Sequence, residues 1–264
     1  MDQESYEYTG MMADAWDLLR GDTSSWSDRF FYRDLIGQYG QPVLDVGCGT
    51  GRLLLDYLAQ GIDIDGVDNS PEMLAICFEQ AQRLGLHPRV FEQAMERLDL
   101  PRTYRMIMVP SSSFQLLIDP QDAQEAMHRF FRHLESGGVL VMPFMLLWNE
   151  PTTQLIVHST WEVNGEAVRP EDGSTIRRWT RSTLDLAQQL ESTEDRYEVL
   201  RDGSVIATEM HVRSPATRWY TQSQALRLYQ EAGFTGMQVF KDFSQEAASP
   251  EDTLFSILGT RPWG

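Results

Sequence analysis

The sequence is poor in cysteine and lysine, and it has no long apolar run. Its two cysteines, Cys48 and Cys77, do not make a disulfide framework. Lys241 is the only lysine, which almost excludes a catalytic lysine. No apolar run approaches the roughly eighteen residues of a membrane span, and the acidic start, Met1–Glu4, lacks the apolar segment of an export signal. We therefore expect a cytoplasmic protein that does not enter a membrane.

Positive charge is also scarce. The 264 residues carry 39 acidic and 22 basic side chains, a net charge of −17. Nucleic-acid binding depends on neutralising phosphates with lysine and arginine, so this balance counts against a DNA or RNA partner. The five histidines and two cysteines form no group with metal-ligand spacing, so we predict no metal. An apolar content of 42% is ample for a full core.

What the chain does have is a run of alternate glycines, Gly47, Gly49 and Gly51, after the apolar segment 43–46. The pattern predicts a buried strand, a tight loop and then a helix, with backbone N–H groups open to a ligand at the helix start. The spacing differs from the G-x-G-x-x-G of dinucleotide loops. Asp45, two residues upstream, disfavours a phosphate and suits a ligand with ammonium or sulfonium charge.

A second acidic residue ends the next apolar run. Asp68 follows segment 62–67, about twenty residues on, where an α/β fold places the acid that accepts from a ribose. Ser70 and Pro71 then predict the N-cap and first residue of a helix.

Together these segments resemble the class I S-adenosylmethionine (SAM)-dependent methyltransferases, which implies SAM as the cofactor. Segments 136–141 and 231–234 add to the resemblance, which covers roughly residues 40–148 and 220–260. A nicotinamide enzyme or a ligand-free fold is the alternative.

The order of elements predicts an α/β fold, a Rossmann-like, doubly wound sheet of seven mostly parallel strands. Strands are expected near 42–46, 62–67, 88–92, 104–109, 138–146, 236–242 and 253–260, and helices near 11–20, 26–39, 51–60, 71–84, 120–134 and 222–232. The cofactor-binding domain is then 1–150 with 219–264, including an N-terminal helical lid.

Residues 151–218 predict an inserted antiparallel sheet of about four strands that binds substrate or forms a dimer. Asn164-Gly165, Asp172-Gly173 and Asp202-Gly203 are turn signals. The expected strands are 155–163, 175–186, 196–200 and 205–212. Alternation places Arg177, Trp179 and Arg181 on one face. That face suits either a planar or anionic small molecule or a partner subunit, and both remain open.

The resemblance also implies roles for single residues. Asp45 should hold the methionine ammonium side, the glycine loop should offer its backbone, Asp68 should accept from the ribose, and Asn69 should flank the adenine. Gln93 stands where the family often has an acid, and Tyr6, Tyr8 and Trp16 resemble a tyrosine-rich lid. The cofactor-binding set is Asp45, Gly47, Cys48, Gly49, Gly51, Asp68, Asn69, Gln93, Ala94, Met95, Pro110, Tyr8 and Trp16.

No catalytic residue is assigned, because methyl transfer from a sulfonium needs alignment more than acid–base help. Candidates are Ser111, Ser113, His158 and Tyr220. The preferred hypothesis is transfer to nitrogen or oxygen of a small molecule, without nucleic acid or membrane and with a homodimer through the insertion as a possibility. A protein or tRNA methyltransferase, or a SAM-binding protein without activity, are the alternatives; the charge and the missing Asn-Pro-Pro-Tyr-like motif at 110–115 count against the former.

Overall fold

The computed structural model describes residues 8–264, which divide into two compact units. The larger unit is Ser24–Asn149 with Trp219–Gly264. Of the described residues, 8–23 and Glu150–Arg218 form the smaller unit. The N-terminal helices, which the sequence analysis assigns to the cofactor-binding domain, are therefore grouped with the insertion. None of the helices within residues 8–264 has the length and apolar character of a transmembrane span.

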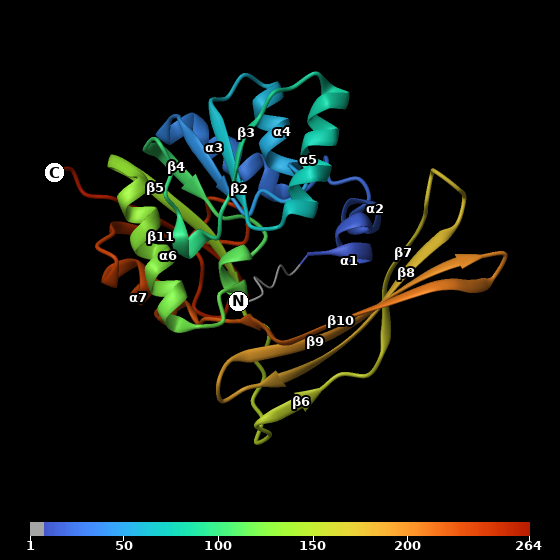
Figure 1. Ribbon diagram of the computed structural model, residues 1–264. Helices are drawn as coiled ribbons and strands as arrows, with labels where there is room; N and C mark the ends of the chain where they lie inside the picture. The colour runs from blue at the N-terminus through green and yellow to red at the C-terminus, as the bar shows by residue number, and fades with distance from the viewer. Residues whose placement is uncertain (1–7) are drawn as a thin grey trace. The chain divides into compact units, whose positions relative to one another are not determined.

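The larger unit is built on a seven-stranded sheet of order β11-β12-β5-β4-β1-β2-β3 (Figure 1). The strands β1 to β5 are parallel neighbours, and β12 pairs antiparallel with both β5 and β11. The predicted Rossmann-like sheet is thus confirmed. The bounds are β1 Val43–Val46, β2 Ile64–Asp68, β3 Arg89–Glu92, β4 Tyr104–Met108, β5 Leu134–Met145, β11 Thr235–Lys241 and β12 Leu254–Thr260.

Helices pack on both faces of this sheet, each over its own apolar cluster. On one face, α6 and α7 pack through Phe130 and Tyr229. On the other, α3, α4 and α5 pack through Leu35, Leu54 and Cys77. The bounds are α3 Ser27–Tyr39, α4 Arg52–Ala59, α5 Pro71–Leu84, α6 Pro120–His133 and α7 Gln222–Glu231, with 3-10 turns η1 Met95–Arg97 and η2 Ser113–Leu116.

The helices begin where the sequence supplies caps. Ser70 accepts the N–H of Met73 at 3.2 Å, with Pro71 as the first helical residue of α5. Asp119 does the same for α6, and Thr221 opens α7 with a capping box. Because Ser70 closely follows β2, its cap fixes the path of the chain at the carboxyl edge of the sheet.

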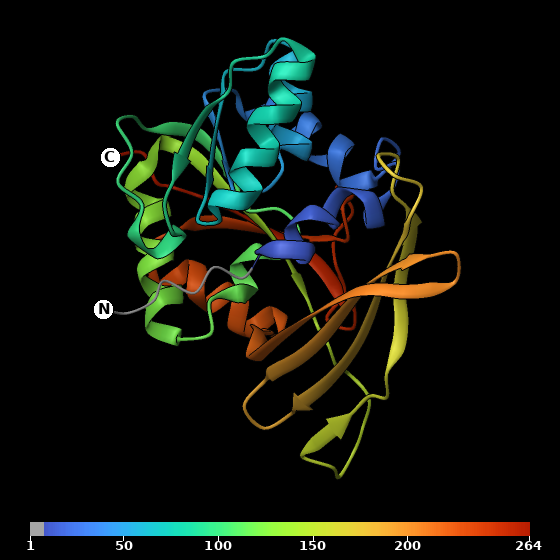
Figure 2. The ribbon, with the colours of Figure 1, turned by 45° about the vertical axis from the view of Figure 1, so that its right-hand side comes forward.

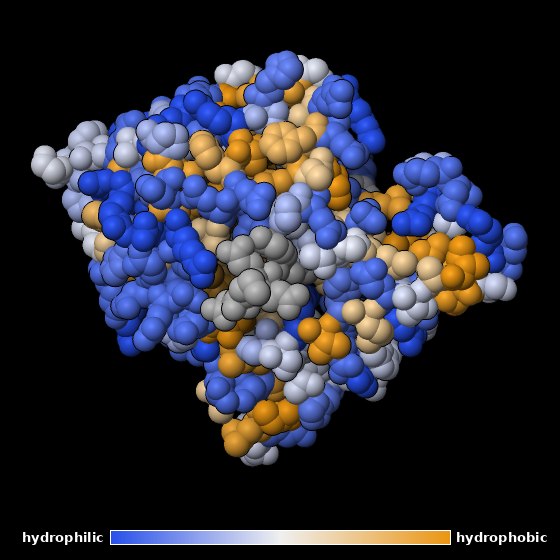
Figure 3. Space-filling model, viewed as in Figure 1, coloured by the Kyte–Doolittle hydropathy of each residue, from blue (hydrophilic) through white to orange (hydrophobic). Residues whose placement is uncertain are grey.

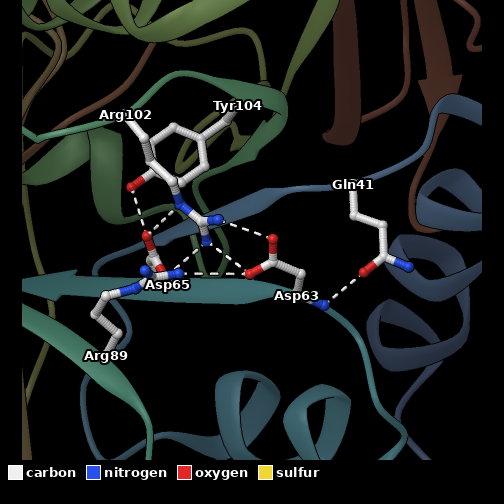
Figure 4. Close-up of polar contacts among 6 residues, drawn as sticks. All are labelled: Gln41, Asp63, Asp65, Arg89, Arg102 and Tyr104. Atoms are coloured by element: carbon white, nitrogen blue, oxygen red, sulfur yellow. Dashed lines mark hydrogen bonds and ion pairs between the residues drawn. The ribbon is translucent and has the colours of Figure 1, made fainter.

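An ionic network joins β2, β3 and β4 at the opposite, amino edge of the sheet (Figure 4). The carboxylate of Asp65 is fully buried and accepts from Arg89 Nε at 2.7 Å, Arg102 Nε at 2.8 Å and the Tyr104 hydroxyl at 2.8 Å. Arg102 also donates to Asp63 at 2.8 Å, which lowers the pKa of that acid. Because these residues come from three strands, the network holds the strand register from the edge opposite the glycine loop.

The smaller unit contains a five-stranded antiparallel sheet in which β8 pairs with β9 on one side and with β6 and β7 on the other (Figure 2). Its long strands twist visibly along their length in Figure 2. Two short helices precede the larger unit in sequence. The bounds are α1 Gly10–Asp14, α2 Trp16–Arg20, β6 Ile156–His158, β7 Glu162–Val168, β8 Thr175–Asp185, β9 Leu190–Arg201 and β10 Ser204–Arg218.

Three local predictions in this unit were wrong. The expected single strand 155–163 is two strands, β6 and β7, so the sheet has five strands and not four. Asn164-Gly165 is no hairpin turn but lies inside β7, where the pairing register with β8 shifts between Val163 and Glu166. Glycine permits such a bulge as readily as a turn. The expected helix 11–20 is two helices, which meet at Ala15.

The two faces of the insertion sheet differ. We call the inner face the one that carries Ile176 and Tyr197, because α1 and α2 cover it through Met12, Ala15 and partly buried neighbours. The outer face carries Arg177, Trp179 and Arg181. Residues of β10 alternate accordingly between half-buried and exposed.

Candidate cofactor site

The chain leaves β1 into a tight loop at the carboxyl edge of the sheet. The backbone passes through Gly47 (φ 71°) and Gly51 (φ 89°), a region that side chains with a Cβ rarely adopt, before α4 begins. A Cβ at Gly47 would lie 2.8 Å from Ser113 Oγ, and one at Gly51 would lie 2.7 Å from Cys77 Sγ. Both positions therefore need glycine for its backbone angle and for its size.

Asp68, at the end of β2, stabilises this loop through two hydrogen bonds from backbone N–H groups. Its Oδ2 accepts the N–H of Gly49 at 2.9 Å, and its Oδ1 accepts the N–H of Ser70 at 2.9 Å. Burial raises the pKa of Asp68, and the backbone hydrogen bonds from Ser70, Gly49 and Asn69 oppose that rise. A carboxylate oxygen has two lone pairs, so the side chain that shapes the loop can still accept from a ligand's hydroxyl groups.

Asp45 carries a buried oxygen without a donor. The residue is 2% exposed, and its Oδ1 has no hydrogen-bond partner among residues 8–264. Burial raises the pKa of Asp45 to about 7; Arg52 lowers it, whereas Asp68 and Asp28 raise it further. A buried acceptor without a partner costs about 1–3 kcal/mol. A ligand that brings a cationic N–H to this oxygen would remove that cost, which fits the ammonium group of SAM.

Arg52, the first residue of α4, is held by an acid that no motif indicated. Its guanidinium donates to both carboxylate oxygens of Asp28 in α3, with Nη1 3.1 Å from Oδ1, and lies 5.1 Å from the ring centroid of Trp26. Asp28 is only 5% exposed. The sequence analysis missed it because an acid in an amphipathic helix is usually solvated. The pair keeps a positive charge close to Asp45.

After β3, the Gln93 side chain makes two hydrogen bonds to the backbone of its own loop. Both ends of the Gln93 amide bond the backbone of Asp99: Oε1 accepts its N–H at 2.9 Å and Nε2 donates to its carbonyl at 3.2 Å. The side chain thus closes the loop that contains η1. Ala94 and Met95 are half-buried at the start of that turn.

The loop after β4 holds strained backbone. Ser111 and Ser112 have φ angles of 56° and 57°, in the left-handed region that residues other than glycine seldom occupy. Such strain clusters at active sites and ligand clamps. Ser113 Oγ donates to the carbonyl of Pro110 at 2.8 Å and packs against Gly47, whereas Ser111 is exposed. Of the two serine candidates, Ser113 therefore supports the loop itself.

Tyr220 and His158 lie in different units. Tyr220 is 9% exposed in the larger unit, with its ring 6.1 Å from that of Phe114 and 6.0 Å from that of Phe144. His158 is exposed on β6 of the smaller unit, where its Nδ1 lies 2.9 Å from Thr183 Oγ1.

The lid residues of the set also belong to the smaller unit. The rings of Tyr8 and Trp16 meet edge to face at 4.7 Å, and Arg20 lies 4.3 Å from the Trp16 ring centroid. Tyr6 lies outside the described residues. Across residues 8–264, no group of three or more His, Cys, Asp or Glu side chains is arranged to hold a metal ion.

The sheet order, the glycine loop and the two acids at the ends of β1 and β2 define a class I SAM-dependent methyltransferase. This is an enzyme class that transfers a methyl group from SAM. The comparisons agree: a sequence model of the methyltransferase domain family matches residues 43–138.

Individual relatives extend this match. A putative methyltransferase of Geobacillus sp. (strain WCH70) is 26% identical over 227 residues, 83% of this chain and 85% of the relative. Glycine/sarcosine N-methyltransferase of Halorhodospira halochloris is 30% identical over 145 residues, which span 53% of this chain and 54% of that protein. The structure is similar to that of a sugar N-methyltransferase from Streptoalloteichus sp., with a TM-score of 0.69, 24% identity and coverage of 99% and 97% of the two chains.

Proposed function

We propose that this enzyme transfers the methyl group of SAM to a nitrogen or oxygen atom of a small molecule by in-line displacement. The observation that carries the proposal is the pair of acids at one sheet edge: Asp45, whose buried Oδ1 has no partner among residues 8–264, and the half-buried Asp68, which fixes the glycine loop. Sulfur leaves as a neutral thioether, so the protein's main task is alignment, worth roughly 7–11 kcal/mol.

For the cofactor, we propose that Asp45 holds the ammonium group and Asp68 the ribose hydroxyls. The backbone of 47–51, including Cys48, would face the amino-acid part, and Pro110 would border the methyl group. Asn69, exposed beside Asp68, together with Ala94 and Met95, would flank the adenine. We omit the Gln93 side chain from the contacts because Asp99 occupies its amide.

For the acceptor, the proposal of a small molecule is supported by charge and by the relatives. A net charge of −17 is unfavourable for a polyanionic partner. The glycine/sarcosine and sugar N-methyltransferases are named for small acceptors. We propose that the insertion, 151–218, recognises the acceptor.

The experiment is a calorimetric SAM titration followed by incubation with glycine, sarcosine and a panel of amino sugars. Release of S-adenosylhomocysteine is scored for each compound against an enzyme-only blank. Product from at least one compound is expected. Tight SAM binding with no product from any of them would contradict a small-molecule acceptor of this kind.

We also propose that the outer face of the insertion forms a homodimer. Arg196 lies 5.3 Å and 5.1 Å from the ring centroids of Trp161 and Trp179, and Val163, Met210 and Val212 are exposed apolar neighbours. Figure 3 shows further apolar side chains gathered toward the β9–β10 hairpin. Light scattering should give twice the chain mass; a monomer that stays monomeric at high concentration would contradict this.

A further inference from the structure

A buried ion pair joins α3 and α4 beside the candidate cofactor site, within the larger unit. Arg52 opens α4, and its guanidinium donates to both carboxylate oxygens of Asp28 in α3. The two side chains are only 13% and 6% exposed. The Trp26 ring adds a cation–π contact, with its centroid 5.1 Å from the guanidinium carbon. A carboxylate and an aromatic ring thus hold one positive charge in a fixed place.

Asp45 of β1 lies at the same helix start. The Arg52 guanidinium and the backbone N–H of Leu54, in the first turn of α4, both lower the pKa of its carboxyl, against the larger rise caused by burial. Arg52 therefore acts on Asp45 as a nearby charge. It does not pair with Oδ1 of Asp45, because that oxygen has no hydrogen-bond partner among residues 8–264. The pairing with Asp28 explains why this gap stays open, since both carboxylate oxygens of Asp28 engage the guanidinium.

The other carboxylates near Arg52 are already engaged. Asp56, one turn further along α4, accepts from Arg29 Nε at 2.6 Å. Both oxygens of Asp68 accept backbone N–H groups of the glycine loop and the start of α5. An Arg52 side chain released from α3 would therefore find its acceptor at Asp45. A buried carboxylate and a buried guanidinium gain most by pairing when neither has another partner.

Three further titratable groups interact with Asp45, from α3, α4 and the glycine loop. Burial raises the pKa of each, so all three stay uncharged near pH 7. They are Tyr32, Tyr57 and Cys48. The charges that act on Asp45 are then Arg52, which lowers its pKa, and Asp68 and Asp28, which raise it.

We propose that Asp28 is a positioning residue for the cofactor: by anchoring Arg52, it keeps the guanidinium off Asp45 and leaves Oδ1 open to the ammonium group of SAM. This role rests on the proposed function of Asp45. Without Asp28, the ammonium group would have to displace an arginine from a buried carboxylate before it could bind there. Asp28 touches neither the cofactor nor the reacting atoms in this account, and it acts through Arg52.

The test compares SAM affinities of the full chain by calorimetry at pH 8. Asp28→Asn keeps the shape of the side chain but loses the charge that holds Arg52, so SAM should bind about tenfold more weakly or worse. Adding Arg52→Gln removes the competitor, and this double variant should bind SAM within about threefold of wild type. The matched control is Asp56→Asn, which breaks the other ion pair between α3 and α4 and should leave SAM affinity unchanged.

A pH profile separates positioning from a merely structural role. In wild type, Asp45 has a pKa of about 7, so SAM binding at about pH 6 should release a proton. In Asp28→Asn, the Arg52 guanidinium should hold Asp45 ionised before SAM arrives. Proton release at this pH should then fall, and SAM affinity should level off at a more acidic pH. The double variant should release the proton again.

Two results would overturn the role of Asp28. One is an Asp28→Asn protein that binds SAM like wild type. The other is weak SAM binding in the double variant, because loss of Arg52 should then relieve the defect. The double variant leaves no buried charge of this pair uncompensated, so its SAM affinity decides the question even where Asp28→Asn does not fold.

Asp45→Asn distinguishes this failure from failure of the proposed function. If Asp45→Asn binds SAM like wild type at pH 8, the role of Asp45 fails, and with it the role that we assign to Asp28. If Asp45→Asn binds SAM weakly while Asp28→Asn binds it normally, Asp45 still holds the ammonium group and only the positioning role of Asp28 is lost.

Discussion

Asp45 should make both stability and SAM affinity depend on pH. A rise in its pKa from 3.8 to about 7 is about 3 units, and at about 1.4 kcal/mol per unit this corresponds to about 4 kcal/mol. Because the folded state holds the proton more tightly than the unfolded state, this stabilisation is full below pH 4. It is lost as the pH rises through about 7.

The change that isolates this effect is Asp45→Asn, which keeps the shape but not the ionisation. Relative to wild type, the variant should gain stability between pH 4 and pH 7, by up to about 4 kcal/mol at pH 8. Denaturant titrations of both proteins at each pH measure the difference directly. A difference that does not change with pH would refute the buried, titrating carboxyl.

SAM should act in the opposite direction, because its ammonium group favours the ionised Asp45. Below about pH 7, binding should therefore release a proton, and SAM affinity should rise with pH and then level off. Calorimetry in two buffers of different ionisation enthalpy measures the protons released. Asp45→Asn should release none from this site and bind SAM more weakly at pH 8; equal proton release by both proteins would refute the assignment.

Three further changes test other parts of the account. Asp68→Ala should weaken SAM binding by about 1–3 kcal/mol, since it removes the acceptor for the ribose hydroxyls and for the loop; unchanged affinity in calorimetry would contradict this role. Arg102→Met should lower unfolding free energy by about 3 kcal/mol and leave SAM affinity intact, whereas Arg83→Ala, at an exposed pair, should cost no more than about 0.5 kcal/mol; equal losses in urea titrations would refute the network's importance. Gly51→Ala should destabilise more than Gly61→Ala, by about 1–3 kcal/mol, because both have positive φ but only the first meets a sulfur atom, at 2.7 Å; similar midpoints in denaturant would rule this out.

The sequence predicted the larger unit well because its signals are local. Every strand of the seven-stranded sheet was expected within a few residues of its position, since buried strands and capped helices alternate. The glycine run and Asp68 could be placed at one edge because parallel strands end on the same side of a sheet.

The sequence predicted less where a residue's role depends on distant partners. Nothing near Asp28 indicates its pairing with Arg52, and nothing near Gln93 indicates that Asp99 would take its amide. Nothing near Glu209 indicates that its carboxylate would accept the N–H of Met11, because this contact forms only where the strand meets α1.

The insertion was the least predictable part. Asn164-Gly165 has the composition of a hairpin turn, but long-range pairing of β7 with β8 converts it into a bulge. The turn between β8 and β9 carries no glycine, and Gln189 adopts a φ of 56° there without any sequence signal.

A crystal structure with S-adenosylhomocysteine tests the central claim most directly. The nucleoside should lie at the carboxyl ends of β1 and β2, with its ribose hydroxyls on Asp68 and its ammonium group toward Asp45. A nucleoside bound elsewhere, or one that contacts neither carboxylate, would contradict the account.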